Sequence, residues 1–176
     1  AINFIESESV NRKIKIDYVV APQVTSPIRE AVDFDDSIEQ IIKTNNIEII
    51  NHHAAQISVT DSVKDPVKDA ESNIIGTLQL LQSAVKLDVR KFIFASTGGA
   101  IYGEQDSFPA KENHPQKPIS PYGISKLSIE GYLRFYQEQY GIKSIIFRYG
   151  NVFGPRQNPN GEAGVVAIFC NRLLKY

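Results

Sequence analysis

Several residue types are scarce in this sequence, and each shortage excludes a class of protein. The 176 residues contain no methionine, no tryptophan and a single cysteine, Cys170. A single cysteine excludes an internal disulfide and any cysteine-rich zinc site, which favours a reducing, cytoplasmic location. No stretch approaches the roughly 18 unbroken apolar residues of a membrane-spanning helix. We therefore expect no membrane partner.

The sequence also lacks an excess of either charge, because its 19 basic and 20 acidic residues leave a net charge of −1. The lysines and arginines are scattered along the chain and do not form the basic patch that marks nucleic-acid binding. The composition is otherwise that of an ordinary globular domain. These features predict a small-molecule partner and no nucleic acid.

Glycine is missing from the first part of the chain, where none precedes Gly76. Residues 1–32 contain one plausible strand, at 13–20, and no glycine-rich turn. Because position 1 is also not methionine, we expect that the chain does not start at a natural beginning. We predict two parts: an N-terminal segment of unclear origin at 1–32 and a partial domain at 33–176.

From about residue 33 onward, apolar patterns of helical spacing alternate with short extended runs. The helical patterns cover 37–45, 66–87, a segment opened by Ser120, and 164–174, and the extended runs cover 47–51, 91–95 and 143–148. Strands separated by helices of this length imply right-handed crossovers and a parallel sheet that helices cover on both faces. The predicted fold class is therefore α/β, with a doubly wound parallel sheet.

Polar and small residues follow each of these strands, in the segments "NHHAAQ", "STGGAIYG" and "YGNVFGPRQ". In an open α/β sheet the ligand crevice lies beyond the carboxyl ends of the strands, so all three segments should face one cleft. His52 and His53 do not predict a metal site. Neighbours on a strand point to opposite faces, and no carboxylate or thiol lies at ligand spacing.

The segment "SPYGISK" carries the most specific chemistry in the sequence. Ser120 is a good N-cap and Pro121 suits the first helical turn, so a helix should begin here. Tyr122 and Lys126 lie four residues apart and should share one helix face. A nearby ammonium lowers the pKa of a phenol, which would make Tyr122 a general base. Such a pair alone is weak evidence, because most are simple surface contacts.

Three motifs occur in order at the strand ends: "FIFASTGGAIYG", "SPYGISK" and "RYGNVFGPRQ". With this order and spacing, the chain from about 33 to 176 resembles the extended short-chain dehydrogenase/reductase family, and in particular its nucleotide-sugar epimerases. The resemblance implies a Rossmann-like domain at 33–176 that binds NAD. It also implies that this domain is incomplete, because the first strand with its glycine-rich loop and the C-terminal sugar-binding lobe are not recognisable.

The resemblance assigns catalytic roles to four residues. Tyr122 would remove a hydroxyl proton from the sugar, while Lys126 would lower the pKa of Tyr122 and bind the nicotinamide ribose. A serine or threonine hydroxyl completes such sites. Counting forward from the preceding strand places this hydroxyl at Thr97, with Ser96 as second choice, whereas counting back from the following Tyr-Gly pair places Gly98 there.

Further positions are assigned to the cofactor and the substrate by the same resemblance. The cofactor set is Asp33, Phe34, Ala54, Ala55, Gln56, Asn73 and Tyr149, in addition to Tyr122 and Lys126. The substrate set is Thr97, Tyr122, Asn151 and Val165. Several positions have a structural alternative. Asp33 could cap a helix, Asn73 could simply be solvated, Val165 could pack in the core, and the hydroxyl of Thr97 or Ser96 could merely cap a strand end.

The predicted reaction is NAD-dependent 4-epimerisation of a UDP-hexose, between UDP-glucose and UDP-galactose, through a 4-keto intermediate. A nucleotide-sugar 4,6-dehydratase is the rival within the family, but this sequence has Gly98 and Gly99 where a dehydratase places an acidic pair. The second hypothesis is an inactive fragment or degenerate relative that acts as a dimerisation or weak nucleotide-binding module. In both cases we expect a homodimer through the helices at 66–87 and 120–140.

Overall fold

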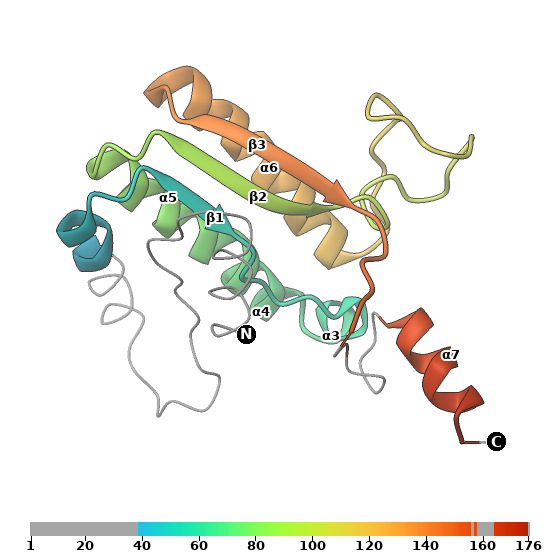
Figure 1. Cartoon of the computed structure of the whole chain (residues 1–176). Helices are drawn as coiled ribbons and strands as arrows, with labels where there is room; N and C mark the ends of the chain where they lie inside the picture. The colour runs from blue at the N-terminus through green and yellow to red at the C-terminus, as the bar shows by residue number, and fades with distance from the viewer. Residues whose placement is uncertain (1–38, 156, 158–163, 176) are drawn as a thin grey trace. The chain divides into compact units, whose positions relative to one another are not determined.

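The computed structural model describes residues 39–155, 157 and 164–175 of the chain (Figure 1). Several sequence predictions fall outside these residues. They are the N-terminal segment at 1–32 with its strand, the domain boundary at 33, and the cofactor positions Asp33 and Phe34.

Three parallel strands form the described sheet, in the order β1-β2-β3 (Figure 1). Their bounds are Ile49–His52 for β1, Lys91–Thr97 for β2 and Lys143–Tyr149 for β3. This confirms the predicted parallel sheet. The register pairs Thr97 with Tyr149, so β2 and β3 end side by side at the same edge of the sheet. That edge carries the polar segments singled out in the sequence.

The helices follow the predicted alternation, with two differences. Described helices cover 39–45, α3 Val59–Lys64, α4 Pro66–Ala70, η1 Glu71–Ile75, α5 Gly76–Lys86, α6 Pro121–Tyr140 and α7 Val165–Leu173. The helix predicted at 66–87 is a helical run that a π-helical turn, η1, interrupts, and the short α3 was not predicted. Among the described helices, none has the length and apolar character needed to cross a bilayer.

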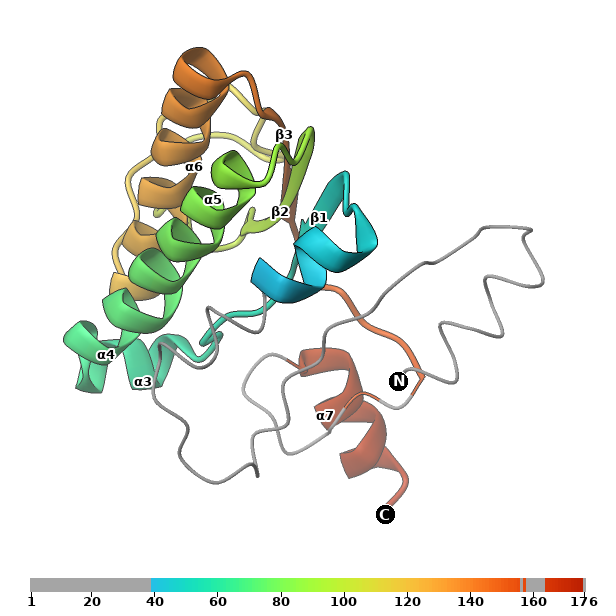
Figure 2. The ribbon, with the colours of Figure 1, turned by 90° about the vertical axis from the view of Figure 1, so that its left-hand side faces the viewer.

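The core lies between the sheet and the helices on one of its faces. Phe92 and Phe94 of β2 are fully buried there, against Leu81 of α5 and against Ile129 and Leu133 of α6. Figure 2 shows α5 and α6 together on this side of the sheet. Full burial of such side chains stabilises the fold by about 1.5–3 kcal/mol each.

The opposite face of the described sheet carries the second set of strand side chains. Side chains alternate along each strand, and the set that points away from α5 and α6 stays partly accessible. These side chains are 37–50% exposed: Ile49, Ile145, Phe147 and Tyr149. Apolar side chains on this face are typical of a parallel sheet that is covered on both faces. The described residues supply the layer of helices on one of these faces.

Candidate active site

The first turn of α6 positions Tyr122 through its N-cap and through one contact with α3. The Ser120 hydroxyl accepts a hydrogen bond from the backbone N–H of Gly123 at 3.2 Å, and Pro121 is the first helical residue. The backbone N–H of Tyr122 donates to the Ser62 hydroxyl of α3 at 3.2 Å. The predicted N-cap is thus confirmed, and α3 satisfies one of the amide groups that a helix start leaves without a partner.

Gly123 allows α6 to approach the turn that follows β2. A Cβ atom at this position would lie 2.6 Å from the carbonyl oxygen of Ala100, which only glycine avoids. The backbone also runs tightly at Gly98, whose N–H donates to the Tyr149 carbonyl at 2.6 Å. The start of α6 and the ends of β2 and β3 therefore meet at one place.

Lys126 is buried beneath Tyr122, with only 3% of its surface exposed. Its ammonium lies 5.8 Å from the centre of the Tyr122 ring and 4.7 Å from that of Phe94. It donates a hydrogen bond to the carbonyl oxygen of Ala95, the third-last residue of β2, at 2.9 Å. The structure therefore brings the predicted pair together on one face of α6.

The electrostatics of this pair differ from the sequence prediction. Burial lowers the pKa of Lys126 to about 8, against an opposing effect of the Asp69 carboxylate. The pKa of Tyr122 is raised, first by burial and second by Asp69. The predicted lowering of the Tyr122 pKa is therefore wrong for this structure, because loss of water disfavours the phenolate. The prediction from the four-residue spacing took account of the nearby ammonium and did not include the effect of burial on the Tyr122 pKa.

Ser96 and Thr97, the two candidates for the catalytic hydroxyl, point to opposite faces of β2. Ser96 is buried on the helix side and donates to the Glu130 carboxylate at 2.6 Å. Thr97 is partly exposed, and its hydroxyl oxygen accepts from the backbone N–H of Ala100 at 3.3 Å. Because the only hydrogen of the Ser96 hydroxyl is engaged with Glu130, the geometry favours Thr97.

Sequence reasoning missed the buried ion pair next to Ser96. Arg148 of β3 binds the Glu130 carboxylate of α6 at 2.6 Å, and the two side chains are 17% and 2% exposed. Arg148 also donates to the Tyr102 hydroxyl and to the carbonyl oxygen of Glu112, both at 2.9 Å. The arginine thereby ties the loop after β2 to the sheet and to α6.

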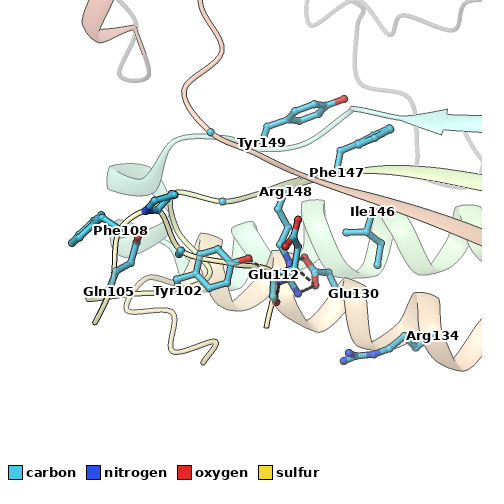
Figure 3. Close-up of a pocket in the computed structure, with 14 residues that line it drawn as sticks. Tyr102, Gln105, Phe108, Glu112, Glu130, Arg134, Ile146, Phe147, Arg148 and Tyr149 are labelled. Carbon is cyan, nitrogen blue, oxygen red and sulfur yellow. Dashed lines mark hydrogen bonds and ion pairs between the residues drawn. The ribbon is translucent and has the colours of Figure 1, made fainter. Parts of the chain in front are cut away.

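A pocket of about 820 Å³ lies beside this ion pair (Figure 3). Its wall includes Tyr102, Phe108, Arg134 and Arg148, together with Tyr149 at the end of β3. The residues that line it do not include Tyr122, Lys126 or Thr97. Gly98 and Tyr149 are the lining residues that adjoin Thr97 in the chain or across the strand pair, so the pocket lies next to the candidate site and does not contain its catalytic residues.

A second buried network, also missed, centres on Asp69 of α4. Asp69 is 1% exposed and accepts hydrogen bonds from Ser125 at 2.7 Å and from Gln56 and Asn73 at 3.0 Å. Asn73 also exchanges two hydrogen bonds with the backbone of Gln56, at 2.9 and 3.0 Å. Gln56 and Asn73 were both predicted to bind the cofactor. The hydrogen bonds described for their side chains are all made with other groups of the protein.

His52 is a largely buried side chain that is hydrogen-bonded to Thr77. The Thr77 hydroxyl donates to the Asn73 carbonyl at 2.6 Å, so its oxygen accepts from Nε2–H of His52 at 3.0 Å. Burial and the nearby charge of Lys126 lower the pKa of His52 to about 4. The imidazole is therefore neutral at pH 7. Within the described part of the chain, no group of three potential ligands could hold a metal ion.

The remaining predicted positions lie around the carboxyl ends of the strands or beyond them. Ala54 and Ala55 follow β1, and Tyr149 ends β3 with its ring 5.9 Å from that of His53. Asn151 is exposed in the next loop, and Val165 is the first residue of α7. No hydrogen bond or ring contact described in the structure links Asn151 or Val165 to Tyr122.

Comparison with known proteins places the chain in a family. Its sequence matches the NAD dependent epimerase/dehydratase family over residues 7–175. The chain belongs to this family. A UDP-glucose 4-epimerase of Mycolicibacterium smegmatis is 46% identical over 127 residues, which are 72% of this chain and 41% of that relative.

Two solved structures of this family are similar to the chain along nearly its whole length. The UDP-glucose 4-epimerase of Thermotoga maritima with UDP-glucose is 42% identical, with a TM-score of 0.82 over 98% of this chain and 59% of that one. The Thermus thermophilus UDP-glucose 4-epimerase complex with NAD is 41% identical, with a TM-score of 0.81 over 97% and 58%. The chain spans less than half the length of the curated relatives it matches first.

Proposed function

We propose that this chain carries the catalytic segment of an NAD-dependent UDP-hexose 4-epimerase, with Tyr122 as the base. The observation that supports this most is the joint placement of Tyr122, Lys126 and Thr97. The first turn of α6 meets the ends of β2 and β3, and a buried ammonium lies 5.8 Å from the ring of the phenol. Both similar structures named above are UDP-glucose 4-epimerases.

In the proposed reaction, Tyr122 takes the proton of the sugar's C4 hydroxyl as C4 gives up its hydride. The same residue returns the proton after the 4-keto sugar has turned over, so no net oxidation results. Thr97 would hold the C4 oxygen by a hydrogen bond. NAD, when bound, would supply the acceptor and later the donor of the hydride.

The described residues fit the nicotinamide end of NAD. The Lys126 ammonium has three N–H groups, and its described hydrogen bond to Ala95 uses one of them. The other two could bind the hydroxyls of the nicotinamide ribose. The small side chains of Ala54 and Ala55 and the ring of Tyr149 would lie along the cofactor. The fit does not extend to the pyrophosphate, because no glycine precedes Gly76 to form the usual turn.

The dehydratase alternative has less support. Elimination of water requires an additional acid and base next to the catalytic hydroxyl, whereas Gly98 and Gly99 follow Thr97 here. A Cβ atom at Gly98 would lie 3.1 Å from the Arg148 carbonyl oxygen, so the backbone itself favours glycine at that position. Formation of a 4-keto-6-deoxy sugar by the enzyme would overturn the choice of epimerisation.

We also propose that the chain forms a homodimer through α6 and the helical run from α4 to α5. Of the tyrosines at four-residue spacing on α6, Tyr136 is buried in the core, while Tyr132 and Tyr140 are 42% and 54% exposed. Phe135 beside them is 48% exposed.

Replacing Tyr132 and Phe135 by serine should shift the sedimentation coefficient from dimer to monomer. Phe108→Ser, at an exposed loop residue, is the control, and a wild-type chain that is monomeric at high concentration refutes the dimer.

The test of the catalytic proposal is NAD binding by this polypeptide, followed by addition of UDP-glucose while the absorbance of reduced nicotinamide is recorded. Binding and reduction are expected if the site is functional. Tyr122→Phe should keep the fold and lower turnover by about two to four orders of magnitude. Absence of both binding and reduction would favour the second hypothesis, an inactive fragment or degenerate relative.

A further inference from the structure

Asp69 stands out as a buried carboxylate for which the sequence motifs supplied no role. It lies in α4, is 1% exposed and has no ion-pair partner among the described residues. Burying a carboxylate costs several kcal/mol unless hydrogen bonds replace its hydration. Here three neutral donors do so: the Ser125 hydroxyl on one oxygen, and the amides of Gln56 and Asn73 on the other.

These three donors come from three separate parts of the fold. Gln56 belongs to the segment after β1, Asn73 to the π-helical turn η1, and Ser125 to α6. Ser125 is the residue directly before Lys126 and lies three residues after Tyr122. The carboxylate is thus joined to the segment that carries the proposed catalytic pair, at a distance of 2.7 Å from the Ser125 hydroxyl.

We propose that Asp69 is a positioning residue for Tyr122 and Lys126, which it orients through Ser125 while placing a fixed negative charge beside both. This inference rests on the proposed function, since it concerns the same pair. The alternative is that Asp69 only holds the three segments together by hydrogen bonds and has no electrostatic effect on the pair. A variant that removes the charge of Asp69 and keeps its shape distinguishes these two roles.

The expected electrostatic effect has a defined sign on both residues. A carboxylate stabilises the ammonium of Lys126, and it opposes ionisation of the Tyr122 phenol, so it raises the pKa of each. On the described elements that pack against the pair, the following ionisable groups are neutral or paired. His52 of β1 has a pKa of about 4, the exposed Lys64 and Asp61 of α3 pair with each other, and Glu130 of α6 is bound to Arg148.

Asp69→Asn is the variant that removes the charge and keeps the shape. The amide oxygen can accept from Gln56 and Asn73, and the amide nitrogen can donate to Ser125, whose hydroxyl reorients. Glu71→Gln is the matched control, because it removes an exposed carboxylate two residues further along the same helical run.

The measurement is a spectrophotometric titration of tyrosinate in the chain without NAD or sugar. The chain has eight tyrosines, so the signal of Tyr122 is obtained by subtracting the curve of Tyr122→Phe in each background. Tyr122 should ionise at lower pH in Asp69→Asn than in wild type, and at an unchanged pH in Glu71→Gln.

An unmoved curve in a folded Asp69→Asn chain, or an equal shift in Glu71→Gln, overturns the proposal. If Asp69→Asn does not fold, Ser125→Ala is titrated instead. It removes one donor and keeps the charge, and a curve identical to wild type again overturns the positioning role. Because the titration uses neither cofactor nor substrate, its outcome does not depend on whether the chain binds NAD.

Discussion

Replacement of Lys126 by methionine should reveal how much stability the proposed site costs. Burial lowers the pKa of Lys126 from its ordinary 10.5 to about 8 in the folded chain. Between these two values the unfolded chain binds more protons than the folded chain, so folding stability rises with pH in this window. Below about pH 8 the full cost of the buried ammonium is present. A methionine of similar length does not carry this cost.

The size of the effect follows from the pKa difference. At about 1.4 kcal/mol per pKa unit, the shift from 10.5 to about 8 corresponds to roughly 3 kcal/mol. Integration of the proton-binding difference from pH 7 to pH 9.5 gives about 2 kcal/mol. Loss of the hydrogen bond to Ala95 adds a contribution that does not vary with pH. The prediction therefore concerns the pH dependence of the difference between variant and wild type.

The assay is urea unfolding of wild type and Lys126→Met at several pH values in this range. The free energy of unfolding of the variant, minus that of wild type, should fall by about 2 kcal/mol from pH 7 to pH 9.5. Lys68→Met, at an exposed lysine of α4, is the matched control and should give a constant difference. A constant difference for Lys126→Met as well would refute the burial argument.

Two further predictions concern contacts that hold the site in place. Glu130→Gln leaves the partly buried guanidinium of Arg148 without its counter-ion, and should lower the free energy of unfolding by about 3 kcal/mol in urea titrations; a loss under about 1 kcal/mol would contradict this. Gly123→Ala places a methyl group against the Ala100 carbonyl and should cost about 1–3 kcal/mol. Gly131→Ala, with no atom within 4 Å of the new methyl group, should stabilise α6 by about 0.5–1 kcal/mol, and equal effects of the two alanines would contradict the close approach.

Local sequence patterns were sufficient to predict the sheet and the start of α6. The strands at 91–95 and 143–148 and the helix opened by Ser120 correspond to β2, β3 and α6, because apolar spacing and capping residues act over a few positions. The pairing of Tyr122 with Lys126 has the same origin, since it follows from helical periodicity.

The rest of the site depends on partners that lie far apart in the sequence. Asp69 and Ser125 are 56 residues apart, and Ser96 and Glu130 are 34 apart, so no local pattern marks either pair. The raised pKa of Tyr122 was missed for a related reason, because burial is produced by the whole fold. The interruption of the run at 66–87 by η1 likewise coincides with the tertiary contacts of Asn73.

The face of α6 that carries Tyr122, Lys126 and Glu130 shows why two buried carboxylates near one lysine should have different roles. Helical spacing alone would pair Lys126 with Glu130. Arg148 instead binds Glu130 at 2.6 Å, and the carboxylate that acts on Lys126 is Asp69. Loss of Glu130 should therefore reduce stability and leave the titration of Tyr122 in place, whereas loss of the charge at Asp69 should move that titration. A Glu130→Gln chain in which Tyr122 titrates as it does in Asp69→Asn would show that the two carboxylates act as one electrostatic unit, and that Arg148 does not separate them.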